Sequence, residues 1–120
     1  MSILRRSLIV FSLLAAGLAP VATRAQDKAS PRTIAITAKR FQFEPKEVHL
    51  KAGERVKLAV TSEDVTHGFF SRPLHFDEDL TPGKTVEVPI EAASAGTYTI
   101  ICDHFCGSGH GGMMMTLVVE

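Results

Sequence analysis

The sequence predicts an all-β domain, a β-sandwich or Greek-key barrel of about seven strands, over residues 33–120. Three features support this prediction. Apolar and polar residues alternate along several short runs, turns that contain glycine or proline separate the runs, and no run in this range has the length of an independent helix. With 120 residues, of which 45% are hydrophobic and 22% charged, the chain can form one core and is too apolar for wholesale disorder.

Each of the first four expected strands shows this alternation. Ile34 and Ile36 lie on one face of the first strand, and Val56, Leu58 and Val60 lie on one face of the fourth. Alternation of this kind puts one side of a strand into the core and leaves the other side to solvent. These strands are expected at residues 33–38, 41–43, 48–50 and 55–61.

The second half of the domain is expected to add three more strands. Val86 and Val88 alternate with polar residues in one of them, and β-branched and aromatic residues dominate another. Turn sequences at 81–84 (Thr-Pro-Gly-Lys) and 94–96 (Ser-Ala-Gly) separate the runs. The three strands are expected at residues 85–90, 97–101 and 116–119.

Between these two halves lies a segment with little alternation, residues 63–80. It contains His67, His75 and the acidic run 77–79, and we expect it to form loops with at most one strand. The only candidate helix is residues 91–95, which is too short to be stable by itself.

The amino-terminal residues have the pattern of a cleavable signal peptide. Arg5 and Arg6 precede a twelve-residue apolar run, and small residues at positions 23 and 25 place the cleavage before Gln26. A membrane-spanning helix needs about 20 apolar residues, so we favour export over the alternative of an uncleaved anchor. The expected layout is a signal peptide over residues 1–25, a polar linker over 26–32 and one domain over 33–120.

The charge of the chain excludes some partners. Lys and Arg together number 13, as do Asp and Glu, which gives no net charge. Removal of residues 1–25 takes away three arginines and no acidic residue, so the exported chain is mildly acidic. A nucleic-acid partner is not expected, because binding to phosphates needs a basic surface. We expect a mature chain without a transmembrane span, located in the periplasm if the source is a Gram-negative bacterium.

The most informative sequence lies between the last two expected strands. Cys106, His110 and Met113 supply a thiol, an imidazole and a thioether from one glycine-rich loop. Glycines let such a loop turn sharply, so that these side chains can converge. Soft sulfur donors together with imidazole select copper, or zinc if the thioether is left aside.

A mononuclear blue-copper site needs a second histidine from elsewhere in the fold. His67 is the best candidate, because the chain there has left the strand 55–61 and can reach the same end of a sandwich. Cys102 adds a second thiol on the glycine-rich loop. One copper ion does not need two thiolates from one short loop, whereas two thiolates can bridge two copper ions.

Together these residues resemble a known family. The pattern Cys-x3-Cys-x3-His-x2-Met, with an upstream histidine in Asp-Val-Thr-His-Gly-Phe, is similar to the binuclear CuA domain of cytochrome c oxidase subunit II and nitrous oxide reductase. The resemblance implies a cupredoxin fold that carries single electrons between redox partners, such as a cytochrome c and a terminal oxidase or reductase. It implies no catalytic residue and at most the role of an electron-transfer subunit in a cytochrome c oxidase-like complex.

The resemblance also implies a ligand set for two copper ions. Two thiolates would bridge both ions, each imidazole would bind one ion, and a thioether and a backbone carbonyl would be the weak ligands. Such bridging spreads one unpaired electron over both metals, so bond lengths change little on reduction. The bridging thiolates would be those of Cys102 and Cys106, and the imidazoles those of His67 and His110. The weak ligands would be the thioether of Met113 and the carbonyl of His104.

The chain departs from oxidase subunit II in three respects. It has a cleavable signal in place of transmembrane helices, His104 in place of a glutamate, and no tryptophan. Three other functions therefore stay open. They are a carrier that delivers Cu(I), which the methionine run 113–115 favours, a mononuclear blue-copper protein, and a thiol–disulfide protein. A purely structural disulfide would close too small a loop to constrain the unfolded chain much.

The remaining histidines and methionines have simpler interpretations. His49 alternates with apolar neighbours and is expected to face solvent, and His75 is only a minor candidate for a secondary copper site. Met114 and Met115 are expected to pack in the fold rather than to contact copper. The acidic run 77–79 is expected to be solvated, with steering of a basic cytochrome as the alternative.

Overall fold

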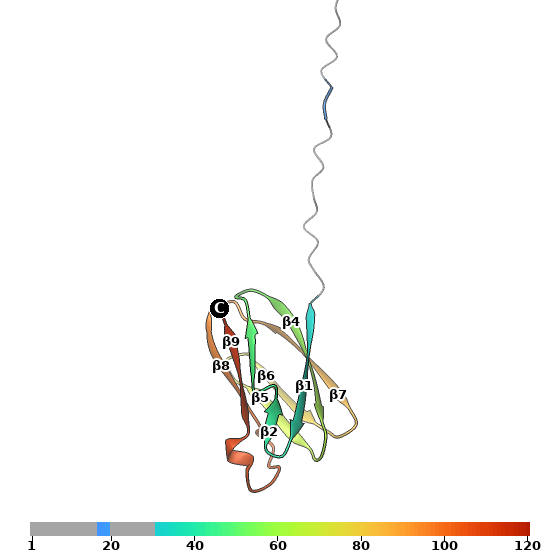
Figure 1. Ribbon diagram of the computed structural model, residues 1–120, viewed down its shortest axis with the longest axis vertical. Coiled ribbons are helices and arrows are strands. Elements are labelled where there is room, and N and C mark those ends of the chain that lie inside the picture. Colours follow the sequence, from blue (N-terminus) through green and yellow to red (C-terminus); the bar gives the residue numbers. More distant parts are fainter. Residues whose placement is uncertain (1–16, 20–30) are drawn as a thin grey trace, which may run out of the picture.

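The structure is a computed structural model that describes residues 17–19 and 31–120 (Figure 1). Nearly all of the expected signal peptide and linker therefore lie outside the described residues. Within those two ranges, no helix has the length and apolar character needed to cross a membrane.

Two β-sheets pack face to face and make up the domain, with nine strands and one short 3-10 helix, η1 (His110–Gly112), among the described residues. The first sheet has the strand order β2-β1-β4-β7, and the second has the order β3-β9-β8-β5-β6. The strands are β1 (Arg32–Lys39), β2 (Gln42–Glu44), β3 (Glu47–Leu50), β4 (Arg55–Ser62), β5 (His67–Ser71), β6 (Phe76–Leu80), β7 (Thr85–Glu91), β8 (Gly96–Ile101) and β9 (Met114–Val119).

The core lies between the two sheets and follows the alternation of the sequence. Val56, Leu58 and Val60 of β4 are all buried, as their shared face predicts. Phe43 of β2 and Phe69 of β5 join the two sheets, with ring centroids 5.4 Å apart at an angle of 71°. This edge-to-face geometry is one that aromatic pairs prefer. The prediction of an all-β sandwich is confirmed.

The expectation of loops with at most one strand over residues 63–80 is wrong, because β5 and β6 both lie there. Four of the five residues of β5 are buried, so the strand shows no alternation. β6 lies at the edge of its sheet and carries three exposed acidic residues, as edge strands often do. The candidate helix at 91–95 is also wrong, because β7 runs to Glu91 and residues 92–95 are irregular.

The pairing of three strands places the functional loops together. β8 runs antiparallel to both β5 and β9, with Ile101 opposite Phe70 on one side and Met114 on the other. The start of β5, the end of β8 and the start of β9 therefore meet at one end of the second sheet. Figure 1 shows the loop between β8 and β9 at the end of the sandwich away from the C-terminus.

His49 faces solvent on β3, as its alternation with apolar neighbours predicts. Its Nε2 lies 3.3 Å from a carboxylate oxygen of Glu47, and its Nδ1 lies 3.3 Å from one of Glu120. These two interactions raise the pKa of His49 above its ordinary value of 6.5, and the interaction with Glu47 has the larger effect.

This raised pKa predicts a pH dependence of stability. The two ion pairs stabilise the fold below pH 6.5, and the contribution is lost as the pH rises through the pKa of His49 in the folded state. We expect the melting temperature of the wild type to fall relative to that of His49→Gln between about pH 6 and about pH 8. Thermal melts of both proteins across this range test the prediction, and parallel pH profiles would contradict it.

Candidate metal centre

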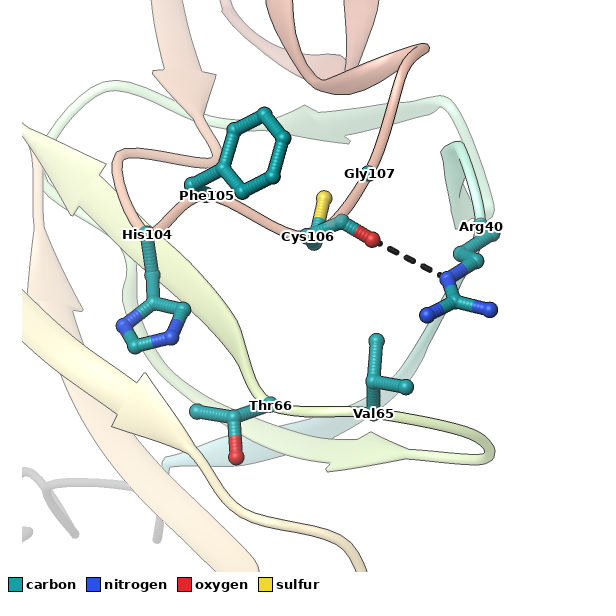
Figure 2. A pocket seen from close by; sticks show the side chains of 7 residues that line it. All are labelled: Arg40, Val65, Thr66, His104, Phe105, Cys106 and Gly107. Carbon is teal, nitrogen blue, oxygen red and sulfur yellow. Dashed lines mark hydrogen bonds between the residues drawn. The ribbon is translucent and has the colours of Figure 1, made fainter.

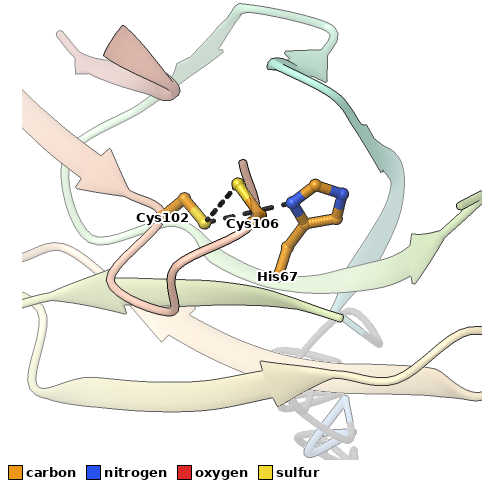
Figure 3. A group of neighbouring side chains, drawn as sticks. All are labelled: His67, Cys102 and Cys106. Atoms are coloured by element: carbon orange, nitrogen blue, oxygen red, sulfur yellow. Dashed lines mark hydrogen bonds between the residues drawn. The ribbon is translucent and has the colours of Figure 1, made fainter. Parts of the chain in front are cut away.

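Two buried cysteines lie at the centre of the site, in the loop between β8 and β9. The Sγ atoms of Cys102 and Cys106 are 3.6 Å apart (Figure 3). Both cysteines are free thiols, with only 4% and 5% of their surfaces exposed. The amide of Cys102 donates to the carbonyl of Met113, at 3.0 Å, and this bond closes the base of the loop.

One group of donors surrounds Cys102. The Nδ1 atom of His67 lies 4.0 Å from the Cys102 Sγ, and the carbonyl oxygen of His104 lies 3.1 Å from it. His67 opens β5 and is fully buried. Its ring points toward the two thiols from the neighbouring strand (Figure 3). Nδ1 of His67 and the two sulfur atoms all lie within 4.8 Å of one another.

A second group of donors surrounds Cys106. The Nδ1 atom of His110 lies 3.7 Å from the Cys106 Sγ, and the Sδ atom of Met113 lies 3.8 Å from it. The turn of η1 brings both residues to the same side, because the Met113 amide donates to the His110 carbonyl at 3.1 Å. The structure thus brings together all six groups that the sequence singles out.

The protein-family comparison matches residues 8–118 to the cupredoxin-like domain. This chain belongs to that family. The cupredoxin is 32% identical over 88 residues to cytochrome c oxidase subunit 2 of Thermus thermophilus, an alignment that covers 73% of this chain and 65% of the relative. It is 33% identical over 92 residues to the nitrous-oxide reductase of Cupriavidus necator, and this alignment covers 73% of this chain and 14% of the relative. The cupredoxin therefore spans less than two thirds of the length of these relatives.

Solved structures agree with this family. A haem-copper terminal oxidase dimer contains a chain that superposes with a TM-score of 0.69 at 26% identity, over 78% of this cupredoxin and 68% of that chain. Auracyanin A, a blue copper protein from Chloroflexus aurantiacus, superposes with a TM-score of 0.62 at 21% identity, over 76% and 100% of the two chains. At that identity, the second likeness concerns the fold alone.

A carboxylate that the sequence analysis missed orients one imidazole of the cupredoxin. Asp64 Oδ1 lies 2.6 Å from Nε2 of His67. Burial alone would raise the pKa of Asp64, but the backbone amides of Arg40 and Val65 and the ring of His67 lower it to about 2. The group is therefore ionised at neutral pH, Nε2 of His67 donates to it, and the lone pair of Nδ1 is left to face the thiols. The spacing Asp-x2-His is the signal that could have revealed this contact.

We expect Asp64→Asn to weaken copper binding by about tenfold or more, since an amide holds the ring less firmly than a carboxylate does. Competition with a copper chelator measures the change. Asp79→Asn is the matched control, because Asp79 lies on exposed β6 and contacts the side chain of His104, at 3.8 Å, rather than a donor atom. Equal copper affinities for the two variants would contradict the orienting role of Asp64.

The protonation of the second thiol links metal uptake to pH. Burial raises the pKa of the Cys106 thiol, and the interaction with Cys102 raises it further by a smaller amount. The thiol is therefore protonated in the metal-free protein at neutral pH. A metal ion binds the thiolate, so its uptake must release this proton.

Close backbone packing brings the loop of Cys102 against β5. A Cβ atom added at Gly68 would lie 2.0 Å from Oδ1 of Asp103 and 2.6 Å from the backbone nitrogen of His104. The absence of a side chain also lets the Gly68 amide donate to the Cys102 Sγ, at 3.3 Å. The glycine that follows His67 is thus needed for the two ligand-bearing segments to meet.

Other residues that the sequence singled out lie further from the thiols or point elsewhere. Met115 is buried in the core, as expected, whereas Met114 is 48% exposed. Phe105 is 74% exposed, and its ring lies 5.7 Å from the ring of His110 at the edge of the site. His75 lies in the turn after β5, at the opposite end of that strand from His67.

A depression of about 290 Å³ borders the centre on its open side. Arg40, Val65 and Thr66 line one side of it, and residues 104–107 line the other (Figure 2). The guanidinium Nε of Arg40 donates to the carbonyl of Cys106 at 3.0 Å. A charged side chain from outside both ligand loops therefore contacts the backbone of a candidate ligand.

Proposed function

We propose that this cupredoxin binds two copper ions in a CuA-type centre and carries single electrons between redox partners. The observation that carries the proposal is the pairing of donors around two adjacent thiols. Cys102 has the imidazole of His67 and a backbone carbonyl beside it, and Cys106 has the imidazole of His110 and a thioether. Each thiol thus has one strong and one weak additional donor.

The chemistry and the spacing of the donor set fit copper. Thiolate, imidazole and thioether are the soft and borderline donors that this metal prefers. Two donors to one ion lie at most about 4.6 Å apart when each metal–sulfur bond is about 2.3 Å. The sulfur–sulfur and sulfur–nitrogen separations here are 3.6 to 4.0 Å. Binding would therefore need little movement of the chain.

When bound, a pair of copper ions would accept and release one electron that both metals share. The residues of the chain would keep this exchange fast by keeping the site rigid and dry. His67 and Met113 have 0% and 1% of their surfaces exposed, which excludes water from the inner side. Strands hold the loop at both ends, so little reorganisation accompanies a change of charge.

The outer side of the site offers a route for the electron. His110 is half-buried, and its ring lies 5.7 Å from the ring of exposed Phe105. A redox partner that packs on this end of the sandwich would come close to a ligand of the centre. We propose an exported protein whose partner is a cytochrome c, a terminal oxidase or a reductase, in keeping with its oxidase and reductase relatives.

The methionine run that favours a copper carrier is divided among three environments. Met113 lies beside Cys106, Met114 points outward and Met115 belongs to the core. Of the three thioethers in this run, only that of Met113 therefore contacts a thiol, which favours the electron-transfer role over the carrier role.

Copper reconstitution tests the proposal. The purified protein is reduced, loaded with copper and freed of excess metal, and copper per chain is measured beside the electron paramagnetic resonance spectrum. We expect two ions per chain and hyperfine splitting from two equivalent copper nuclei. Splitting from one nucleus would favour a blue-copper protein, one tightly held Cu(I) would favour a carrier, and no uptake would favour a thiol–disulfide protein. Each of these three results would overturn the proposal.

A further inference from the structure

Arg40 lies in the turn between β1 and β2, outside both segments that carry the candidate ligands. Its backbone amide donates to Oδ2 of Asp64 at 2.7 Å. The other oxygen of Asp64 accepts from Nε2 of His67 at 2.6 Å. The backbone of Arg40 is thus two hydrogen bonds away from one imidazole.

The side chain of the same residue reaches the other half of the centre. Its Nε donates to the carbonyl of Cys106, a residue 66 positions later in the chain, at 3.0 Å (Figure 2). His67 and Cys106 are therefore connected twice. One connection runs through the Cys102 sulfur, and the other runs through Asp64 and Arg40.

The turn packs against the loop as well as bonding to it. The ring of Phe41 lies under Gly107 and Gly109, where an added Cβ atom would come within 2.9 Å and 2.4 Å of ring atoms. These two glycines let the turn and the loop pack in direct contact. The bond from Arg40 therefore joins two surfaces that already touch, so little side-chain freedom is lost in forming it.

We propose that Arg40 is a positioning residue that holds Cys106 in register with His67 and so ties the two halves of the centre together. The proposal rests on the proposed function of this site. Contacts of this kind fix the direction of a ligand and do not bind the metal themselves. The positive guanidinium beside the centre also favours its less positively charged, reduced form.

Three variants separate the contributions of Arg40. Arg40→Ala removes both the hydrogen bond and the charge, and Arg40→Lys keeps the charge but replaces the guanidinium by a single ammonium group. Lys39→Ala is the matched control, because Lys39 is the adjacent residue, carries the same charge and pairs with Glu44 at 3.4 Å, away from the site. Circular dichroism checks that each variant is folded.

In the copper-loaded proteins, we expect Arg40→Ala to release copper to a chelator about tenfold faster than the wild type. Its reduction potential should be lower, and its hyperfine pattern should show two unequal copper nuclei. Arg40→Lys should recover the potential and part of the retention, whereas Lys39→Ala should match the wild type. Arg40→Ala behaving like Lys39→Ala in all three measurements would overturn the proposal.

The copper-free proteins provide a test that does not depend on the proposed function. Alkylation of the two thiols by iodoacetamide, followed by mass spectrometry, gives a rate for each cysteine. Release of the loop in Arg40→Ala should speed alkylation at Cys106 and leave Cys102 unchanged, because the opening is local. Equal acceleration at both thiols, or no acceleration, would overturn the positioning role. A wild type that binds fewer than two copper ions would instead overturn the proposed function and leave this result to decide on Arg40.

Discussion

Cys102→Ser is expected to reduce the copper content from two ions per chain to one. A serine hydroxyl is a hard, protonated donor that cannot bridge two copper ions, whereas the donors around Cys106 stay in place. The remaining ion would bind to Cys106, His110 and Met113, with His67 as a further ligand. Metal analysis and the hyperfine pattern, which should change to that of a single nucleus, measure the effect.

Cys106→Ser is the matched control for this experiment. It removes the thiol that lies beside both His110 and Met113, at 3.7 and 3.8 Å, so we expect it to retain less copper than Cys102→Ser. Two coupled copper ions in Cys102→Ser would show that the assignment of the bridging ligands is wrong.

Gly68→Ala is expected to destabilise the fold and to disrupt the candidate metal centre at the same time. The new methyl group would lie 2.0 Å from the Asp103 carboxylate and 2.6 Å from the His104 backbone nitrogen. Overpacking of this kind typically lowers the free energy of unfolding by about 1–3 kcal/mol. We expect the upper end of that range, because a backbone atom has to move. The loop should also shift away from β5, so that His67 and Cys102 no longer share a metal ion.

Urea denaturation of the metal-free protein and copper uptake measure the two consequences. Gly111→Ala is the control, because an added Cβ atom at Gly111 meets no atom within 4 Å although the residue lies in the same loop. If the two variants unfold at the same urea concentration and take up the same amount of copper, the close approach at Gly68 has no role in forming the site.

The sequence predicted those parts of the site that depend on local spacing. Cys106, His110 and Met113 lie on one short loop, so residue type and glycine content alone indicate that their donors converge. His67 was placed correctly because its segment follows a strand whose alternation is clear. The sandwich itself followed from seven expected strands, five of which show the period-two pattern, whereas β5 and β6 were not expected as a pair.

The parts that escaped prediction depend on contacts between distant segments. β5 is buried on both faces and β6 is an exposed edge, so neither shows alternation. Arg40 meets Cys106 across 66 positions of sequence, and no local pattern reports such a pair. The signal peptide over residues 1–25 stays a prediction.

The unequal burial of the two imidazoles implies an order in which metal would leave the proposed centre. His67 lies wholly inside the sandwich, whereas His110 is half-buried and its ring lies 5.7 Å from the ring of exposed Phe105. An inner and an outer position therefore differ in accessibility, although each has one imidazole. Chelation would strip the outer position first and pass through a half-filled protein whose last ion sits next to β5.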